Sequence, residues 1–237
     1  MTLRAEPPRY EIKIPCAPHL LPQVQAWVRL HPAHWRVAYP PRQVNNVYFD
    51  TADCQMLNEN LSGAGERGKL RLRWYGPDLG TVAGARLELK YKEGMVGWKD
   101  VCPLDETLDL ACLSWVEIYR ALCEAADARF GLWLAQFSYP VLINCYQRAY
   151  YVAADQAVRL TLDTGLQVYD QRCSRRPNLS RPAPLAERVV IELKAATDRS
   201  SYARLAEAVA CFPLRPDRHS KYVHGMVAAP DYEGVVP

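Results

Sequence analysis

The chain has 237 residues, of which 49% are hydrophobic, and its 29 basic and 26 acidic residues leave a formal net charge of +3. So small a charge gives little support for general binding to nucleic acid or membranes, and no apolar run approaches the roughly 20 residues of a membrane-spanning helix. The eight scattered cysteines form no Cys-x-x-Cys pair and the N-terminal stretch has no apolar signal core, so we expect a reducing, cytoplasmic setting with free thiols.

The expected elements are mostly strands, with helices between them. Strands are indicated where polar and apolar residues alternate, and helices where apolar residues recur with a spacing near 3.6. The stretch 169–187, rich in Pro, Arg and Ser, is typical of a long exposed connection. In chain order we expect strand 9–14, helix 18–32, strands 44–49, 69–75, 86–92 and 97–102, one or two helices within 107–137, strands 141–152, 159–162 and 189–194, and helix 200–212. Because no repeat and no clear linker interrupts them, we expect a single domain over 1–237.

The stretch GAGERGK at 63–69 fits two glycine-rich phosphate-binding patterns, G-x-G-x-x-G and most of G-x-x-x-x-G-K. Both patterns need a buried strand before the glycines and a helix after them, and the second also needs Ser or Thr after the Lys. Here Leu70 follows Lys69, and the sequence continues with the alternation of a strand. These features favour a turn that leads into a strand.

The predicted strands carry charged residues on one face and apolar residues on the other, because alternate residues of a strand share a face. On a single strand, such a face is most simply exposed to solvent. Over six strands, however, basic residues dominate, and like charges on neighbouring strands repel one another. The basic residues are Arg9, Lys13, Lys69, Arg71, Arg73, Arg86, Lys90, Lys92, Arg148, Arg159 and Lys194, and the acidic ones are Glu11, Glu88, Asp163 and Glu192. A polyanion among these side chains would remove the repulsion.

A barrel with its charged faces inward and its apolar faces outward accounts for this pattern. Helices would then cover the outside, and the lumen would be a basic tunnel. Arg and Lys side chains bind phosphate oxygens, and several of them could hold one triphosphate. The few carboxylates would serve as ligands for Mg²⁺ or Mn²⁺, which prefer oxygen donors.

Eight short motifs occur in order along the chain: RYEIKIP, NNVYFDT, KLRLRWY, RLELKYK, YQRAYY, RLTLD, VVIELK and HSKYVHG. Together they resemble the polyphosphate polymerase (VTC) domain of the triphosphate tunnel metalloenzyme, or CYTH-like, superfamily, over residues 9–226. The resemblance implies an α+β fold in which about eight antiparallel strands form a tunnel with helices on the outside.

The resemblance also implies which residues form the site. Lys221, from HSKYVHG, matches a late Ser-Lys-Tyr/Phe motif. Glu192 matches the metal-binding Glu, and Glu11 would be a second carboxylate for Mn²⁺ or Mg²⁺. We expect catalytic roles for Arg71, Arg73, Lys90, Arg148, Arg159 and Lys221, and substrate contacts from Lys13, Arg9, Lys69, Lys92, Lys194 and Tyr146.

Three functions remain open on the sequence alone. The hydrolytic and cyclase branches begin with E-x-E-x-K, whereas this chain has R-Y-E-I-K, so Arg9 replaces a carboxylate that could help to position water. This departure favours a polyphosphate polymerase that uses ATP or another nucleoside triphosphate. A triphosphatase or polyphosphatase, and a non-catalytic polyphosphate-binding module, are the alternatives. Nucleic acid is not an expected partner, because the basic residues are predicted to face inward.

Overall fold

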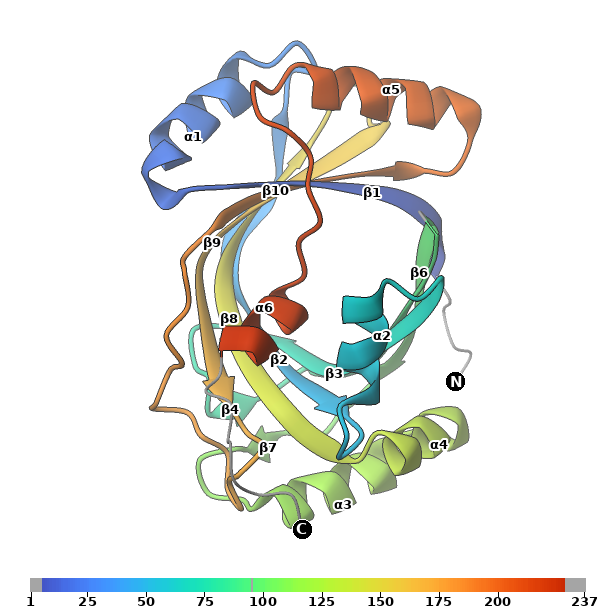
Figure 1. The fold of residues 1–237 in the computed structure, drawn as a ribbon, viewed down its shortest axis with the longest axis vertical. Helices are drawn as coiled ribbons and strands as arrows, with labels where there is room; N and C mark the ends of the chain where they lie inside the picture. Colours follow the sequence, from blue (N-terminus) through green and yellow to red (C-terminus); the bar gives the residue numbers. More distant parts are fainter. Residues whose placement is uncertain (1–5, 95, 229–237) are drawn as a thin grey trace.

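The computed structural model describes residues 6–94 and 96–228, and eight of its strands close into an antiparallel barrel (Figure 1). Around the barrel the strands follow the order β1-β10-β9-β8-β2-β3-β5-β6, and β6 pairs with β1 to close it. The barrel strands are β1 (Glu6–Cys16), β2 (Arg36–Asp50), β3 (Glu66–Tyr75), β5 (Arg86–Glu93), β6 (Val96–Pro103), β8 (Tyr139–Val152), β9 (Val158–Asp170) and β10 (Val189–Ala196). A separate small sheet consists of β4 (Thr81–Val82) and β7 (Leu108–Asp109).

The apolar faces of the strands turn outward, and helices cover them on opposite sides of the barrel. The helices are α1 (Leu21–Leu30), α2 (Gln55–Ser62), α3 (Trp115–Ala125), α4 (Ala128–Gln136), α5 (Arg199–Ala210) and α6 (Lys221–Ala228), with a short 3-10 turn at Pro18–Leu20. α1 and α5 lie at one side of the barrel and α3 and α4 at the other (Figure 1). Ile14 and Leu193 are fully buried with the first pair, as are Leu72 and Trp74 with the second. The charged faces are therefore left to the lumen, and the predicted α+β barrel is confirmed.

Two helices that the sequence pattern did not indicate, α2 and α6, lie across one opening of the barrel (Figure 1). α6 packs closely against the wall, since a Cβ added at Gly225 would lie 2.5 Å from Leu142 Cδ2. Its buried Tyr222 donates a hydrogen bond to the carboxylate of Asp50 and packs against the ring of Tyr48. Each helix has only eight residues, so its apolar spacing repeats too few times to stand out.

Several element boundaries differ from those expected. The helical region predicted within 107–137 starts only at Trp115, where Ser114 and Glu117 form a capping box, and a second cap at Asp127 divides α3 from α4. β2 begins at Arg36, well before the predicted residue 44. The prediction missed its first half because those residues are largely exposed and lack the alternation of a half-buried strand.

The glycine stretch forms a turn that leads into a strand, as expected. α2 ends at Gly63, whose φ of 73° is favoured by glycine, and β3 begins at Glu66. No helix follows the glycines, so the backbone lacks the helix N-terminus of a phosphate-binding loop. Elsewhere in the described chain, none of the helices has the length and apolar character needed to cross a membrane.

Candidate functional site

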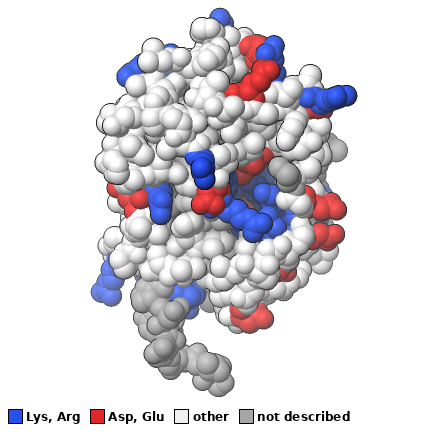
Figure 2. Space-filling model, turned by 45° about the horizontal axis from the view of Figure 1, so that its top comes forward, with Lys and Arg blue, Asp and Glu red and all other residues white. Residues whose placement is uncertain are grey.

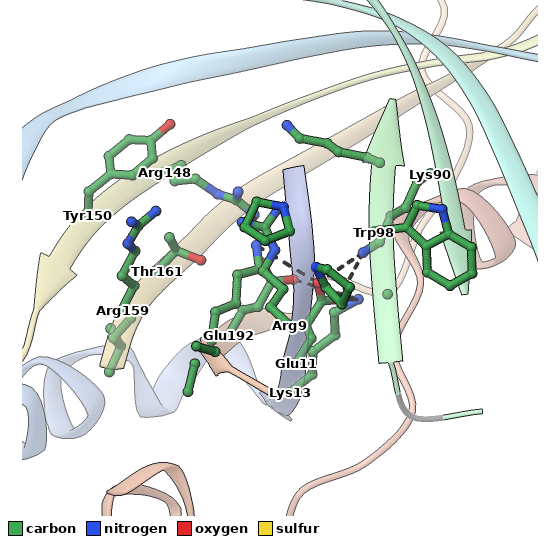
Figure 3. A pocket seen from close by; sticks show the side chains of 18 of the residues that line it. Arg9, Glu11, Lys13, Lys90, Trp98, Arg148, Tyr150, Arg159, Thr161 and Glu192 are labelled. Atoms are coloured by element: carbon green, nitrogen blue, oxygen red, sulfur yellow. Dashed lines mark hydrogen bonds and ion pairs between the residues drawn. The ribbon is translucent and has the colours of Figure 1, made fainter. Parts of the chain in front are cut away.

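The lumen of the barrel contains a cavity of about 880 Å³, and most of the charged side chains that line it are basic. Figure 2 shows Lys and Arg side chains gathered in a hollow of the surface, and Figure 3 shows lining side chains that converge from different strands. The basic residues that line the cavity are Arg9, Lys13, Lys69, Arg71, Arg73, Arg86, Lys90, Lys99, Arg148, Arg159, Lys194 and Lys221. Every basic residue predicted for the site is therefore present except Lys92.

Glu88, on β5, organises the cations of one wall, and we call this group the Glu88 cluster. Its carboxylate is fully buried. Oε2 accepts a hydrogen bond from Arg71 Nε at 2.8 Å and lies 3.6 Å from Arg73 Nη1, while Oε1 lies 2.9 Å from Arg86 Nε and 3.0 Å from Lys99 Nζ. Burial alone would raise the pKa of Glu88, but Arg73, Arg71 and Lys99 lower it well below its ordinary value. Glu88 is therefore ionised and holds its cations toward the lumen.

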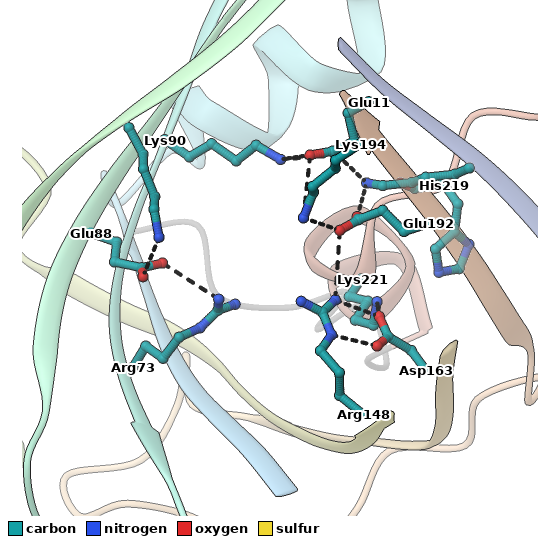
Figure 4. A network of polar contacts seen from close by, with 12 residues as sticks. Glu11, Arg73, Glu88, Lys90, Arg148, Asp163, Glu192, Lys194, His219 and Lys221 are labelled. Atoms are coloured by element: carbon teal, nitrogen blue, oxygen red, sulfur yellow. Dashed lines mark hydrogen bonds and ion pairs between the residues drawn. The ribbon is translucent and has the colours of Figure 1, made fainter. Parts of the chain in front are cut away.

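Glu11 and Glu192 form a second group with the lysines of β1, β5 and β10, the Glu11–Glu192 cluster (Figure 4). Lys13 Nζ lies 3.1 Å from Glu11 Oε1 and 3.7 Å from Glu192 Oε2. Lys194 forms an ion pair with Glu192, and Lys90 Nζ lies 2.9 Å from Glu11 Oε2. The register places Lys13 opposite Glu192 and Glu11 opposite Lys194, so each carboxylate has a lysine across the strand pair.

Asp163 anchors the third group, the Asp163 cluster, at the end of the lumen near α6. Arg148 Nε and Nη2 bind its two carboxylate oxygens at 2.6 and 2.7 Å, which is a bidentate arrangement. Lys221, at the start of α6, donates a hydrogen bond to Asp163 Oδ2 at 2.5 Å. Arg148 Nη2 also lies 3.8 Å from Glu192 Oε1, so this cluster adjoins the Glu11–Glu192 cluster.

The other predicted residues occupy distinct parts of the lumen. Tyr146 is buried between clusters, where its hydroxyl accepts a hydrogen bond from Arg73 Nη2 at 3.4 Å and its ring lies 4.5 Å from Lys221 Nζ. Arg159 is exposed and lies near Tyr150 and Thr161 (Figure 3). Lys69 Nζ donates a hydrogen bond to Ser220 Oγ at 2.8 Å.

Lys92 lies outside the main cavity and lines a second one of about 510 Å³. Arg67 and Arg218 contribute further positive charge to this second cavity. The two cavities share Glu11, Lys13, Lys69, Lys90 and Ser220 in their walls. The basic surface therefore continues from the lumen past Lys69 and Lys90 to the side where the segment 216–220 crosses.

Some residues of the site were not predicted as site residues. Glu88 and Asp163 were noted only as charges on a polar face, and their roles as counter-ions depend on which strands become neighbours. Lys99 lies on the predicted strand 97–102, where both faces mix charged and apolar residues, so the alternation did not indicate which way it points. Ser220 lies beside the predicted Lys221, but its contact with Lys69 joins residues far apart in the sequence.

The lumen has more positive charge than its carboxylates neutralise. Burial lowers the pKa of Lys69 well below its ordinary value, and the neighbouring ammonium groups of Lys13 and Lys90 lower it further. Burial likewise lowers the pKa of Lys90 to about 8, although Glu11 partly offsets the change. Burial is the largest cause of both changes, and repulsion between the neighbouring ammonium groups adds to it.

The oxygen donors that a metal ion in this lumen would use are carboxylates from two strands, Glu11 on β1 and Glu192 on β10. Among residues 6–94 and 96–228, no group of three or more His, Cys, Asp or Glu side chains could hold a metal by itself. Glu192 Oε1 is buried and forms the ion pair with Lys194, and within the described chain it accepts no hydrogen bond of normal geometry. Burial and repulsion from Glu11 raise the pKa of Glu192, but Lys194, Lys13 and Arg148 outweigh both effects and lower it well below its ordinary value.

Comparisons with known proteins agree with this geometry. A family model described as the VTC domain matches residues 8–229. The PH1819 protein from Pyrococcus horikoshii OT3 is similar in structure, with a TM-score of 0.50 and 13% identity over 92% of this chain and 98% of that one. A candidate adenylate cyclase from Vibrio parahaemolyticus has a TM-score of 0.48 and 12% identity over 89% of this chain and 94% of that one. The search of curated proteins gave no match. At such identities, the structural likeness to PH1819 shows the fold alone.

Proposed function

This chain belongs to the VTC domain family, and from that premise we propose that it is a polyphosphate polymerase. It transfers the terminal phosphoryl group of a nucleoside triphosphate, such as ATP, to the end of a polyphosphate chain inside the tunnel. The observation that carries the proposal is the convergence of basic side chains from all sides of a cavity of about 880 Å³. A chain of phosphates is a ligand of matching charge and extended shape.

The three clusters give the triphosphate distinct contacts. Arg71, Arg73 and Arg148 present guanidinium groups that can bind phosphate oxygens in pairs. Lys13, Lys90 and Lys221 add localised charges. Because the buried carboxylates already orient these groups, binding requires little rearrangement of the cations.

A divalent metal fits the carboxylates of the Glu11–Glu192 cluster. Mn²⁺ and Mg²⁺ take oxygen ligands and are commonly held by one or two carboxylates together with substrate phosphates. Glu192 and Glu11 would hold the ion, which would take the place of the Lys194 ammonium beside Oε1 of Glu192. When bound, such an ion supplies neutralisation of charge on the phosphate oxygens.

Transfer of a phosphoryl group to a phosphate acceptor does not require a strong general base from the protein. The nucleophile is the terminal phosphate of the growing chain, which is already anionic, so positioning and electrostatic stabilisation carry most of the catalysis. Arg71, Arg73 and Arg148 would hold the transferred group and the leaving diphosphate. Arg9 stands where the hydrolytic branches have a carboxylate, and it adds positive charge to a position that could otherwise help to orient water.

Incubation of the purified chain with ATP and Mn²⁺ tests the proposal. We expect ADP together with polyphosphate chains that are resolved by gel electrophoresis. Release of orthophosphate without chains would indicate a triphosphatase instead. Binding of triphosphate without turnover would indicate a binding module.

Arg159→Ala tests the contribution of the lumen cations without removing a buried ion pair, because Arg159 is exposed. Loss of one charged contact to phosphate costs about 1.5–3 kcal/mol, so we expect a loss in triphosphate affinity of about tenfold or more. Arg120→Ala, on the exposed side of α3, is the matched control and should bind normally. Equal affinities in calorimetry would place Arg159 outside the binding site.

Glu192→Gln tests the metal role. We expect it to abolish metal-dependent turnover and to weaken Mn²⁺ binding in the presence of tripolyphosphate, as followed by electron paramagnetic resonance. Binding of tripolyphosphate itself should remain measurable. Glu187→Gln, which removes an exposed carboxylate just before β10, is the control. Unchanged turnover and Mn²⁺ affinity in Glu192→Gln would refute the role.

A further inference from the structure

Ser220 and Lys69 form a hydrogen-bonded pair at the junction of the two cavities. Lys69 comes from β3, and Ser220 immediately precedes α6. The distance between Lys69 Nζ and Ser220 Oγ is 2.8 Å. Both residues line both cavities, so a phosphate chain that passes between the cavities would pass this hydroxyl.

Ser220 is held in position by the first turn of α6. The backbone N–H of Val223 donates to Ser220 Oγ at 3.3 Å, and the backbone N–H of His224 donates to the carbonyl of Ser220 at 2.9 Å. α6 is itself fixed by the hydrogen bond between Tyr222 and Asp50. The hydroxyl therefore has a defined orientation and a defined partner, as a nucleophile requires.

The surroundings of Lys69 suit it to accept a proton. Burial and the nearby ammonium groups of Lys13 and Lys90 lower the pKa of Lys69 well below its ordinary value, and Glu11 offsets this only in part. An unprotonated amine at hydrogen-bonding distance from a serine hydroxyl is the arrangement that activates serine in Ser–Lys catalytic pairs.

We propose that Ser220 is itself a phosphoryl acceptor and that Lys69 is its general base. Lys69 Nζ takes the hydroxyl proton while Ser220 Oγ forms a bond to the terminal phosphorus of a bound nucleoside triphosphate. The bond from that phosphorus to the bridging oxygen breaks, and the nucleoside diphosphate leaves with the electron pair. The products are phosphoserine at position 220, a nucleoside diphosphate and protonated Lys69.

The modification would give the polymerase its first acceptor. A phosphoserine presents terminal phosphate oxygens of the same kind as the end of a polyphosphate chain, so the next transfer could extend it. The proposal rests on the triphosphate site of the proposed function, and it adds a covalent start of the chain on the protein.

The experiment incubates the full chain with γ-labelled ATP and Mn²⁺ and locates the label by peptide mass spectrometry. We expect phosphoserine at position 220 in the wild type and none in Ser220→Ala. Lys69→Met should slow labelling by roughly 100-fold or more, in line with the loss of a general base. Ser62→Ala, which removes an exposed hydroxyl at the end of α2, should be labelled like the wild type.

Binding of tripolyphosphate, measured by calorimetry on every variant, separates the two proposals. A wild type that binds tripolyphosphate but carries no label at Ser220 overturns this inference and leaves the proposed function standing. A wild type that does not bind it overturns both. Label that is lost in acid but kept in alkali would lie on a lysine instead of the serine, and it too would overturn the inference.

Discussion

At the scale of single residues, the tunnel depends on buried carboxylates that hold several cations together by neutralising their charge. Glu88 is fully buried and contacts Arg71, Arg73, Arg86 and Lys99. Without it, four cations would face each other in a confined space. The carboxylate therefore acts as a fixed counter-ion, and a bound polyphosphate would share that task.

Glu88→Gln should destabilise the free protein strongly. Removing one partner from a buried ionic group costs about 3–5 kcal/mol, because the remaining charges are left uncompensated. We expect a fall in melting temperature on the order of 10 °C. Tripolyphosphate should raise the melting temperature of the variant more than that of the wild type, since the anion replaces the missing charge.

Glu93→Gln, at the exposed end of the same strand, provides the control and should change stability by less than about 0.5 kcal/mol. If the two variants melted alike, Glu88 would not be holding the cations together.

Lys90 should make triphosphate binding sensitive to pH. Burial lowers its pKa to about 8, so the free protein loses this charge as the pH rises from 7 to 9. Affinity for tripolyphosphate should fall over that range by up to about tenfold, because the protonated fraction of a group with a pKa of about 8 falls about tenfold between pH 7 and 9. Calorimetry at both pH values should show a weaker fall for Lys90→Arg, because arginine stays charged. The same fall in both proteins would contradict the assignment.

The lowered pKa of Lys90 has an opposite consequence for folding. The unfolded chain keeps the proton up to a pKa of about 10.4. Between about pH 8 and that value the unfolded state binds more protons than the folded one, so the contribution of Lys90 to stability increases with pH.

At the scale of elements, α6 both packs against the barrel wall and positions polar groups of the site. It carries Lys221 into the Asp163 cluster, follows directly after Ser220, and packs against β8 and β9 through Gly225. A shift of this helix would therefore move two polar groups in the lumen at once.

Gly225→Ala should destabilise the protein and weaken the site together. The added methyl group would lie 2.5 Å from Leu142 Cδ2 and 3.1 Å from Val168 Cγ1. Overpacking of this kind costs about 1–3 kcal/mol. We expect a lower urea midpoint and a lower affinity for tripolyphosphate.

Gly131→Ala is the matched control, because Gly131 lies in α4 and a Cβ there would meet no atom within 4 Å. It should stabilise the protein by up to about 1 kcal/mol through helix propensity. Destabilisation of equal size in both variants would show that crowding at Leu142 is not the cause.

At the scale of the whole molecule, closure of the barrel creates the enclosed site, and the closing seam between β1 and β6 is its weakest part. β1 pairs with β10 without interruption from Arg9 to Cys16. Its pairing with β6 involves Glu6, Arg9 and Tyr10 and includes a register shift between Glu6 and Arg9. Ion pairs inside the lumen, such as that between Glu11 and Lys90, join β1 to β5 across β6.

Hydrogen exchange should detect this seam. We expect the amides of β6 that face β1 to exchange faster than those between β10 and β9, because local opening needs fewer broken contacts there. Tripolyphosphate at 100 times its dissociation constant should add about 2.7 kcal/mol of protection where opening disrupts the site. Uniformly slow exchange around the barrel would contradict a weak seam.

The sequence alone determined which way the strand side chains point. Alternation along Lys69–Trp74 or Arg86–Lys92 is a local property of an extended backbone, so the separation of charged from apolar faces could be predicted before the fold was known. The ordered motifs then indicated the barrel and nearly all of the basic residues that line it. The sequence pattern did not predict the two short helices, α2 and α6, or the exposed first half of β2, because none of these stretches repeats an apolar pattern often enough.

Only the tertiary structure decided which charges meet. The pairs Arg71–Glu88 and Arg148–Asp163 depend on strand register, and the contact between Lys69 and Ser220 joins residues 151 positions apart. The tertiary structure also placed Lys92 in the second cavity and α6 across the opening of the barrel. The backbone of a single strand decides which side chains share a face. Which side chains meet across strands depends on the free energy of closing the whole barrel, and no local stretch of sequence determines that.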